Sequence, residues 1–437
     1  MSLPLNDPNN MEEKSSLEAS GQVTPVEKPE QAQAQPAPAN EPPNGGVTAW
    51  LQVLGSFILF LNTWGIVNSF GVFQTYYASD MLSSQTESNI SWVGSIQAFL
   101  LLIIGVGTGP LFDMGYFQTL LRTGGFLITF GMFMTSLCTK YWQVMLAQGI
   151  TIGLGSGCLF IPSVAIVSTY FTTKKSFATG IAASGSSLGG VIYPIIFTRL
   201  EPQIGFAWAT RVMAFIMLGT MAVAVAVMRV RVLPPQKRRL VDLAALKEVP
   251  FLMFSIAEFL GFMGMYIPFF YVQSFAIENN IMSSDLAFYM LSILNAASAF
   301  GRIIPNFIAD KTGPLNILVP CCAISALLAF CWIAIDSTAG VIVFGILYGF
   351  FSGTFVSLPP TTVVSLSPNL GVVGTRMGMS FSFAGFGFLV GNPVAGAILK
   401  DHGWLGVQIF CGVMVVAAAA CCVVARFAKA PALMAKA

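Results

Sequence analysis

RVRVLPPQKRRLVDLAALKE, residues 229–248, is the polar stretch in the middle of the chain that decides its fold. Six apolar runs precede it and six follow it, each near the length of about 20 residues that crosses a bilayer as an α-helix. The first six cover roughly 48–75, 90–112, 119–138, 142–168, 177–199 and 206–229. The second six cover roughly 250–275, 286–309, 315–336, 339–366, 374–399 and 404–427. The sequence therefore predicts an all-α integral membrane protein with twelve transmembrane helices in two six-helix repeats.

The composition indicates that most of the surface faces lipid. Of the 437 residues, 55% are hydrophobic and 9% are charged, and the mean hydropathy is +0.75. A soluble domain carries roughly 25% charged residues. The chain has too few charges to cover a soluble protein of this size, so the sequence excludes that class.

The polar segments divide the chain into five parts. Residues 1–46 hold seven acidic and two basic residues and no aromatic one, a composition that cannot bury enough apolar surface to offset the entropy of ordering. The expected parts are a disordered cytosolic tail at 1–46, an N-terminal six-helix half at 47–229, a cytosolic central loop at 230–249, a C-terminal six-helix half at 250–427, and a second cytosolic tail at 428–437.

The distribution of Lys and Arg predicts the orientation. With twelve spans, sixteen of the 21 basic residues lie on the side that holds the amino terminus, four lie on the other side, and Arg302 lies within a span. Both termini are therefore expected in the cytosol. We expect the plasma membrane, with a vacuolar or other internal membrane as the alternative.

Two related turns indicate that the halves are repeats. GPLFDMG at 109–115 ends the second span, and NFIADKTG at 306–313 ends the eighth. Asp113 and Asp310 are 197 residues apart (310 − 113), close to the 203 residues (250 − 47) that separate the starts of the halves. Repeated halves of this kind are common in secondary transporters.

ASGSSLGG, residues 183–190, contains the G-x-S-x-G pattern of a hydrolase nucleophile. The pattern has no strand before it, and Ser187 lies deep in the fifth span, whereas the chain's one histidine, His402, lies in the outer loop between spans eleven and twelve. A Ser-His-Asp triad is therefore excluded, and the small residues are better explained by close helix packing. We expect no enzyme activity, no metal, because no C-x-x-C or H-E-x-x-H occurs, and no cofactor.

Two charged residues lie within predicted spans, where a charge is costly and marks a functional site by default. Glu258 lies eight residues into span seven, and Arg302 lies eight residues before Asp310 in span eight. Both are thus about 12 Å from the inner end of their helices, and we expect them to face each other as an ion pair or to share a central cavity. Arg302 is the candidate for holding a substrate carboxylate. Glu258 is the candidate for its resting partner or for a proton carrier, and a structural bridge is the alternative for both.

Polar and aromatic side chains of the first, seventh, eighth, tenth and eleventh spans are candidates for lining a cavity for an amphipathic substrate. They are Asn62, Trp64, Asn68, Tyr266, Phe269, Tyr271, Asn295, Tyr348 and Phe381. Core packing is the alternative for each of them. Asn62, Asn68, Asn295 and Tyr266 join Glu258 and Arg302 as the candidate binding residues.

One N-glycosylation triplet, Asn89-Ile90-Ser91, follows the first predicted outer loop. It faces outward but lies close to the membrane. Asn89 is therefore a candidate glycosylation site.

Four stretches resemble the major facilitator superfamily, and within it the monocarboxylate porter family and its fungal members. NGGVTAW at 44–50 is similar to the family's approach to the first helix, and YFTTKKSFATGIAASGSSLGG at 170–190 to its approach to the fifth. LNTWGIVNSFGVFQTYY at 61–77 and FGRIIPNFIADKTGP at 300–314 also resemble fungal members. The resemblance covers residues 44 to about 427 and implies a transporter that works by alternating access.

The two Asp-containing turns resemble the superfamily's loop motif, which implies a gating role for Gly109, Asp113, Asp310 and Lys311. Arg122 and Arg376, also at inner helix ends, are interpreted as flanking charges.

The chain departs from the monocarboxylate porters at four positions. Asn44 stands where the family has an acid, and Met114 where the loop motif has a basic residue. Asn68 stands where proton-coupled members have a lysine, and Ser298 where they have an Asp one turn before the helix-eight Arg. The resemblance therefore implies the fold and a transport role more directly than it implies proton-linked lactate transport.

These observations predict a secondary active or facilitative transporter for a small organic anion, monocarboxylate-like, or an amphipathic metabolite. One alternative is an efflux carrier for a secondary metabolite from a biosynthetic gene cluster, and a further one is a non-transporting membrane nutrient sensor. The expected partners are the substrate, with or without a coupled proton, and the lipid bilayer. We expect no nucleic acid and a monomer.

Overall fold

The computed structural model describes residues 42–231, 241–368 and 372–432, except for the side chain of Asp113. Every regular element in these ranges is helical. The predicted tail up to residue 41, central-loop residues 232–240 and the last five residues lie outside the described part. Residues from Pro42 onward form one compact unit.

The first half contains eight α-helices and two π-helices. Their bounds are α1 Val47–Asn62, α2 Trp64–Asn68, α3 Phe70–Tyr76, η1 Tyr77–Met81, α4 Glu87–Asp113, α5 Phe117–Thr135, α6 Tyr141–Val144, η2 Met145–Ile152, α7 Gly153–Tyr170 and α8 Lys175–Val227. α1 to η1 follow one another as a single interrupted span, and so do α6, η2 and α7.

The second half is also helical. A 3-10 turn, η3 Ala245–Lys247, precedes it. The helices are α9 Val249–Gly264, α10 Ile267–Glu278, α11 Ser284–Thr312, α12 Pro314–Cys331, the 3-10 turn η4 Trp332–Ala334, α13 Thr338–Ser357, α14 Pro359–Ser365 and α15 Val373–Lys429.

Two of these helices are too long for one crossing. α8 has 53 residues and α15 has 57, which at about 1.5 Å per residue is roughly 80 Å or more, over twice the hydrocarbon thickness. Each contains a glycine with a positive φ, Gly205 (φ 76°) in α8 and Gly403 (φ 65°) in α15. A side chain disfavours this backbone conformation, so each glycine ends one span and begins the next.

The described residues contain nine helical segments that are long and apolar enough to cross a membrane. Dividing α8 and α15 at their glycines adds two segments, and α5 provides the twelfth. All twelve predicted spans are thus helical, and the predicted all-α membrane fold is confirmed.

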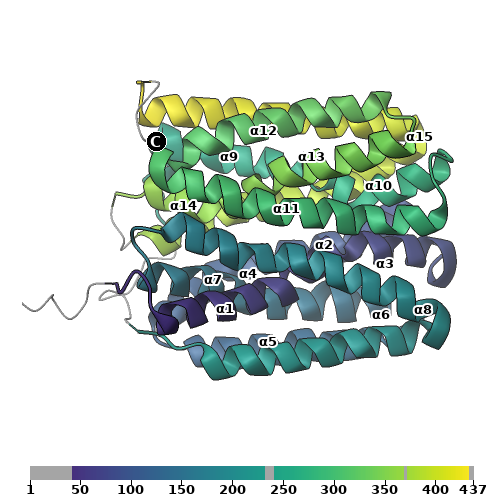
Figure 1. The fold of residues 1–437 in the computed structure, drawn as a ribbon, viewed down its shortest axis with the longest axis horizontal. Coiled ribbons are helices and arrows are strands. Elements are labelled where there is room, and N and C mark those ends of the chain that lie inside the picture. The colour runs from purple at the N-terminus through teal and green to yellow at the C-terminus, as the bar shows by residue number, and fades with distance from the viewer. Residues whose placement is uncertain (1–41, 232–240, 369–371, 433–437) are drawn as a thin grey trace, which may run out of the picture. The chain divides into compact units, whose positions relative to one another are not determined.

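The helices of the first half, α1 to α8, lie on one side of the unit, and α9 to α15 lie on the other (Figure 1). Two seams join the halves: α4 packs against α15, and α8 packs against α11. α1 begins and α15 ends at the same end of the bundle. We name this the inner end, because the charge bias predicts it to be cytosolic, and the opposite end the outer end.

The bundle exposes many large apolar side chains along its helices. Examples are Phe126, Phe130, Phe215, Leu218, Phe300, Leu327, Val343 and Val413. Exposed apolar surface on this scale requires an apolar surrounding. The chain is a multi-pass integral membrane protein.

The small residues of 183–190 let two helices approach closely, as predicted. A side chain at Gly185 would strike the backbone of Phe57 in α1, and one at Gly189 would strike Gly65 and the Leu61 carbonyl. Ser187 is fully buried in this contact. The hydrolase-like pattern is therefore a packing motif.

Candidate functional site

Aromatic rings from both halves meet at the centre of the bundle. The Trp64 ring of α2 is 1% exposed, and its centroid lies 5.8 Å from Phe160, 6.0 Å from Tyr266, 6.1 Å from Phe262 and 6.4 Å from Phe388. Phe160 belongs to the first half, and the other three belong to the second. We name these five residues the ring cluster.

Interrupted helices carry the ring cluster. α1 ends at Asn62, and Trp64 begins α2 after the break at Thr63. α9 ends at Gly264, and Tyr266 caps α10, whose first turn contains Pro268. A proline cannot donate a backbone hydrogen bond and disfavours a helix through the preceding residues. Discontinuous helices at mid-membrane depth are typical of transporter binding sites.

Arg302 of α11 crosses the seam beside the ring cluster and is fully buried. Its guanidinium donates to the Ala183 carbonyl (3.3 Å) and to the Ser186 hydroxyl (2.5 Å), both on α8. It also donates to Ser298 one turn back (3.2 Å), whereas its Nη2 has no partner. No carboxylate of the described residues forms a salt bridge with it. A buried cation that has only neutral oxygens for partners is poorly compensated.

The ion pair expected between Glu258 and Arg302 is not formed. Glu258 of α9 is fully buried, but its Oε2 accepts a hydrogen bond from the Ser380 hydroxyl of α15 (3.3 Å), and its Oε1 has no partner. Glu258 therefore points into the second half, while Arg302 reaches across to the first. The ion-pair expectation was wrong because it placed the two residues by depth alone, and their sharing of a central cavity stays a prediction.

Three other candidate residues have buried polar atoms without partners. Asn68 donates to the Ser186 carbonyl (3.4 Å), and its Oδ1 has no partner. The Asn295 amide of α11 packs so closely against Gly190 of α8 that a side chain at Gly190 would strike it. The Asn295 Oδ1 has no hydrogen-bond partner either. The Tyr266 hydroxyl is unpartnered and close enough to Arg302 for an electrostatic interaction. Polar atoms buried without partners mark a place where a ligand or water can bind.

Asn62 does not join this group. Its Nδ2 donates to the Ile58 carbonyl (3.0 Å) and to Thr220 (2.9 Å), and its Oδ1 accepts from the Tyr193 hydroxyl (2.6 Å). All these partners belong to the first half. The Asn62 amide therefore holds three of that half's spans together, and its predicted contact with substrate is not supported.

Asp310 connects the halves at the inner end. Its two carboxylate oxygens accept hydrogen bonds from the backbone N–H groups of Ser176 (2.9 Å) and Phe177 (3.0 Å), in the first turn of α8. A carboxylate at a helix N-terminus is favoured both by the free N–H groups and by the helix dipole. We name this contact the inner latch.

Asn44 holds the segment just before α8. Its side-chain oxygen accepts from the N–H groups of Thr172 (2.7 Å) and Thr173 (3.0 Å), and the Trp50 ring lies 5.2 Å from that of Phe171. The two stretches 44–50 and 170–190, which carry the family resemblance, thus contact each other. These contacts place residues 42–46 with the helical unit rather than with the predicted tail.

The other residues of the predicted gating motif show no comparable contact. The Lys311 ammonium lies over the Phe307 ring, 5.0 Å from its centroid. A Cβ at Gly109 would make only an ordinary contact with Ile161. The side chain of Asp113 lies outside the described part. The gating role of these residues stays a prediction.

Arg376 does more than flank a helix, contrary to its interpretation from the sequence. This buried side chain at the start of α15 forms salt bridges with Glu248 (2.5 Å) and Asp242 (3.2 Å), both at the end of the central loop. It also donates to the Leu366 carbonyl (2.9 Å). Sequence reasoning missed this role because the acids lie over 120 residues away.

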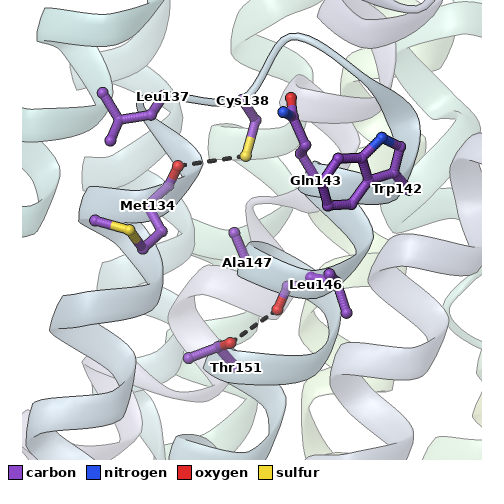
Figure 2. A pocket seen from close by; sticks show the side chains of 8 residues that line it. All are labelled: Met134, Leu137, Cys138, Trp142, Gln143, Leu146, Ala147 and Thr151. Atoms are coloured by element: carbon purple, nitrogen blue, oxygen red, sulfur yellow. Dashed lines mark hydrogen bonds between the residues drawn. The ribbon is translucent and has the colours of Figure 1, made fainter.

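A cavity of about 250 Å³ lies between α5, α6 and η2 (Figure 2). Its lining residues are Met134, Leu137, Cys138, Trp142, Gln143, Leu146, Ala147 and Thr151, all of the first half. A site that alternates between the two sides must touch both halves. This apolar cavity is therefore not the transport site.

A second cavity, of about 260 Å³, opens at the outer end and touches both halves. α3, η1 and α8 line it with Tyr76, Asp80 and Glu201, and α11 contributes Phe288. It forms a vestibule on the outer side of the seam between α8 and α11.

Asn89 lies at the third position of α4, and its side chain is exposed and donates to Gln85 (3.2 Å). Ser91 of the same triplet is buried and donates to the Ser88 carbonyl. Glycosylation of Asn89 stays a prediction.

Two helical halves with interrupted helices and buried polar side chains between them are typical of secondary transporters. The sequence model of the family described as "Major Facilitator Superfamily" matches residues 53–373. The chain belongs to this superfamily of membrane transporters, and it is not an enzyme.

Curated relatives support this placement. The MFS-type transporter dbaD of Emericella nidulans is 48% identical to this chain, and the match covers 85% of this chain and 84% of dbaD. The aspyridones efflux protein apdF of the same organism is 42% identical, covering 86% and 77%. The agnestins efflux protein AgnL12 of Paecilomyces divaricatus is 37% identical, covering 93% and 94%.

Among solved structures, the Escherichia coli fucose:proton symporter FucP is similar with a TM-score of 0.63. The match covers 87% of this chain and 98% of FucP, at 16% identity. It supports the fold.

Proposed function

We propose that this chain exports an amphipathic organic metabolite with an anionic group by alternating access. The observation that carries the proposal is Arg302, a buried cation beside aromatic rings, with a free Nη2 and no acid partner among the described residues. A ligand carboxylate or acidic hydroxyl would supply the missing charge, while the ring cluster would hold the apolar part.

Export is favoured over uptake by the names of the relatives, two of which are efflux proteins. The resemblance to monocarboxylate porters supports the same site for an anion. The lysine and Asp of the proton-coupled members are replaced here by Asn68 and Ser298, which argues against a lactate-type substrate. The plasma membrane is the location that suits an exporter.

Transport by the purified protein in proteoliposomes tests the proposal. The panel contains aromatic carboxylates, their methyl esters, and the compound groups named for two relatives, aspyridones and agnestins. We expect saturable movement of at least one anionic member and weaker movement of its ester. If no member is moved or bound, the transport proposal loses its support and the membrane-sensor alternative gains it.

Glu258 is the candidate for coupling export to protons. A carboxyl buried without a cationic partner is more stable in its neutral form, and exchange of its proton for substrate would couple the two flows. Glu258→Gln keeps the contact with Ser380 but cannot titrate. We expect it to abolish the stimulation of flux by a pH gradient while substrate exchange at equal pH continues. Ser255→Ala, a buried change in the same helix, is the control, and unchanged stimulation in Glu258→Gln contradicts the role.

A further inference from the structure

Two side chains and one glycine close the outer end where α4, α10 and α15 meet. The Ser88 hydroxyl, in the first turn of α4, donates to the Pro393 carbonyl of α15 (3.1 Å). The Tyr271 hydroxyl of α10 donates to the neighbouring Asn392 carbonyl (3.1 Å). One turn of α15 therefore receives a hydrogen bond from each half.

Gly396 lies one turn further along α15 and leaves no room for a side chain. A Cβ there would stand 2.7 Å from the Tyr271 hydroxyl and 3.1 Å from the Ser88 backbone. The first separation requires the end of the Tyr271 side chain to shift, and the second requires α4 and α15 to give by a few tenths of an ångström. The close approach of the halves at this point thus depends on the missing side chain.

Polar atoms are buried around this contact without partners. Gln74 donates to Glu87 (3.1 Å), next to Ser88, but the Gln74 Oε1 has no partner. Both amide atoms of the buried Asn392 are also unpartnered. Helices that are packed permanently satisfy nearly all such atoms. Unsatisfied atoms favour a contact that opens and lets water reach them.

We propose that Ser88, Tyr271 and Gly396 form the outer gate of the transport path, which must separate for substrate to leave. Glu87 and Gln74 are positioning residues that hold the first turn of α4 against it. The gate lies at the opposite end from the inner latch, so the two contacts alternate. The inference rests on the alternating access of the proposed function, but its test needs no substrate.

The test uses Ser91→Cys as a reporter, since Ser91 is buried one turn behind Ser88. A membrane-impermeant maleimide is added to the outer side, and mass spectrometry follows the peptide that carries residue 91. We expect Gly396→Ala to raise the labelling rate about tenfold, because an overpacked contact shifts the population towards the open state. Gly219→Ala, at a helical glycine with open space around it, should leave the rate unchanged.

If Gly396→Ala does not fold, Tyr271→Phe replaces it as the test variant, and it should also raise the labelling rate of Ser91→Cys. Unchanged labelling in folded Gly396→Ala or Tyr271→Phe, or a rise seen only from the cytosolic side, overturns the gate. A confirmed gate with no exported compound would refute the proposed substrate and leave the gate intact.

Discussion

Replacing Arg302 by glutamine is expected to lower export of an anionic substrate about 10- to 100-fold, the range for losing a charge-assisted hydrogen bond in a buried site. The guanidinium is fully buried at the seam, and its Nη2 forms no hydrogen bond in the described part, although the Tyr266 hydroxyl lies close to it. A substrate anion would complete its coordination. Initial rates in proteoliposomes at several substrate concentrations measure the loss, and we expect it mainly in substrate affinity.

A structural role for Arg302 is separable from anion binding. Ser186→Ala removes the acceptor of the 2.5 Å hydrogen bond but leaves the cation in place. If Arg302 only holds the seam, Ser186→Ala should reproduce most of the loss. If it binds the anion, Arg302→Gln should abolish the preference for a carboxylate over its methyl ester, and Ser186→Ala should retain it. Arg302→Lys, which keeps the charge, should recover part of that preference.

The fold was accessible from the sequence because lipid imposes a simple rule: a span needs about 20 apolar residues. The same rule identified Glu258 and Arg302, since a charge inside a span stands out against its neighbours. The hydrogen-bond partners of these two residues could not be predicted from the sequence. Each residue turns a helix by about 100°, so two residues at equal depth can face different neighbours, as Ser380 and Ser186 show.

Contacts between distant segments explain the remaining differences. Arg376 looked like a flanking charge because its acid partners, Asp242 and Glu248, lie over 120 residues before it in the chain. Asn44 looked like a departure from a motif. Its side-chain oxygen nevertheless accepts hydrogen bonds from the backbone N–H groups of Thr172 and Thr173, as a carboxylate would. Asn62 has the polarity of a binding residue, but Tyr193 and Thr220 already satisfy it. Local patterns gave no information on these pairings.

Asp310→Asn is expected to open the inner end. The carboxylate accepts two backbone hydrogen bonds at the start of α8, and removing such a charged cap costs about 1–2 kcal/mol. That corresponds to an increase of about 5- to 30-fold in the population of the inward-open state. Ser184→Cys, on α8 two turns inside the latch, reports it through maleimide labelling from the cytosolic side. Asp285→Asn, in the first turn of α11 at the outer end, is the matched control.

Alternating access adds a stricter requirement, because the same equilibrium must govern both ends. A shift towards the inward-open state by Asp310→Asn should lower outer labelling of Ser91→Cys, and Gly396→Ala should lower inner labelling of Ser184→Cys. The double variant should bring both rates back towards those of the parent protein, since the two free-energy changes oppose each other and the sites are far apart. If Asp310→Asn raised labelling at both ends, the carboxylate would be holding the whole bundle together, and the inner latch would have no gating role.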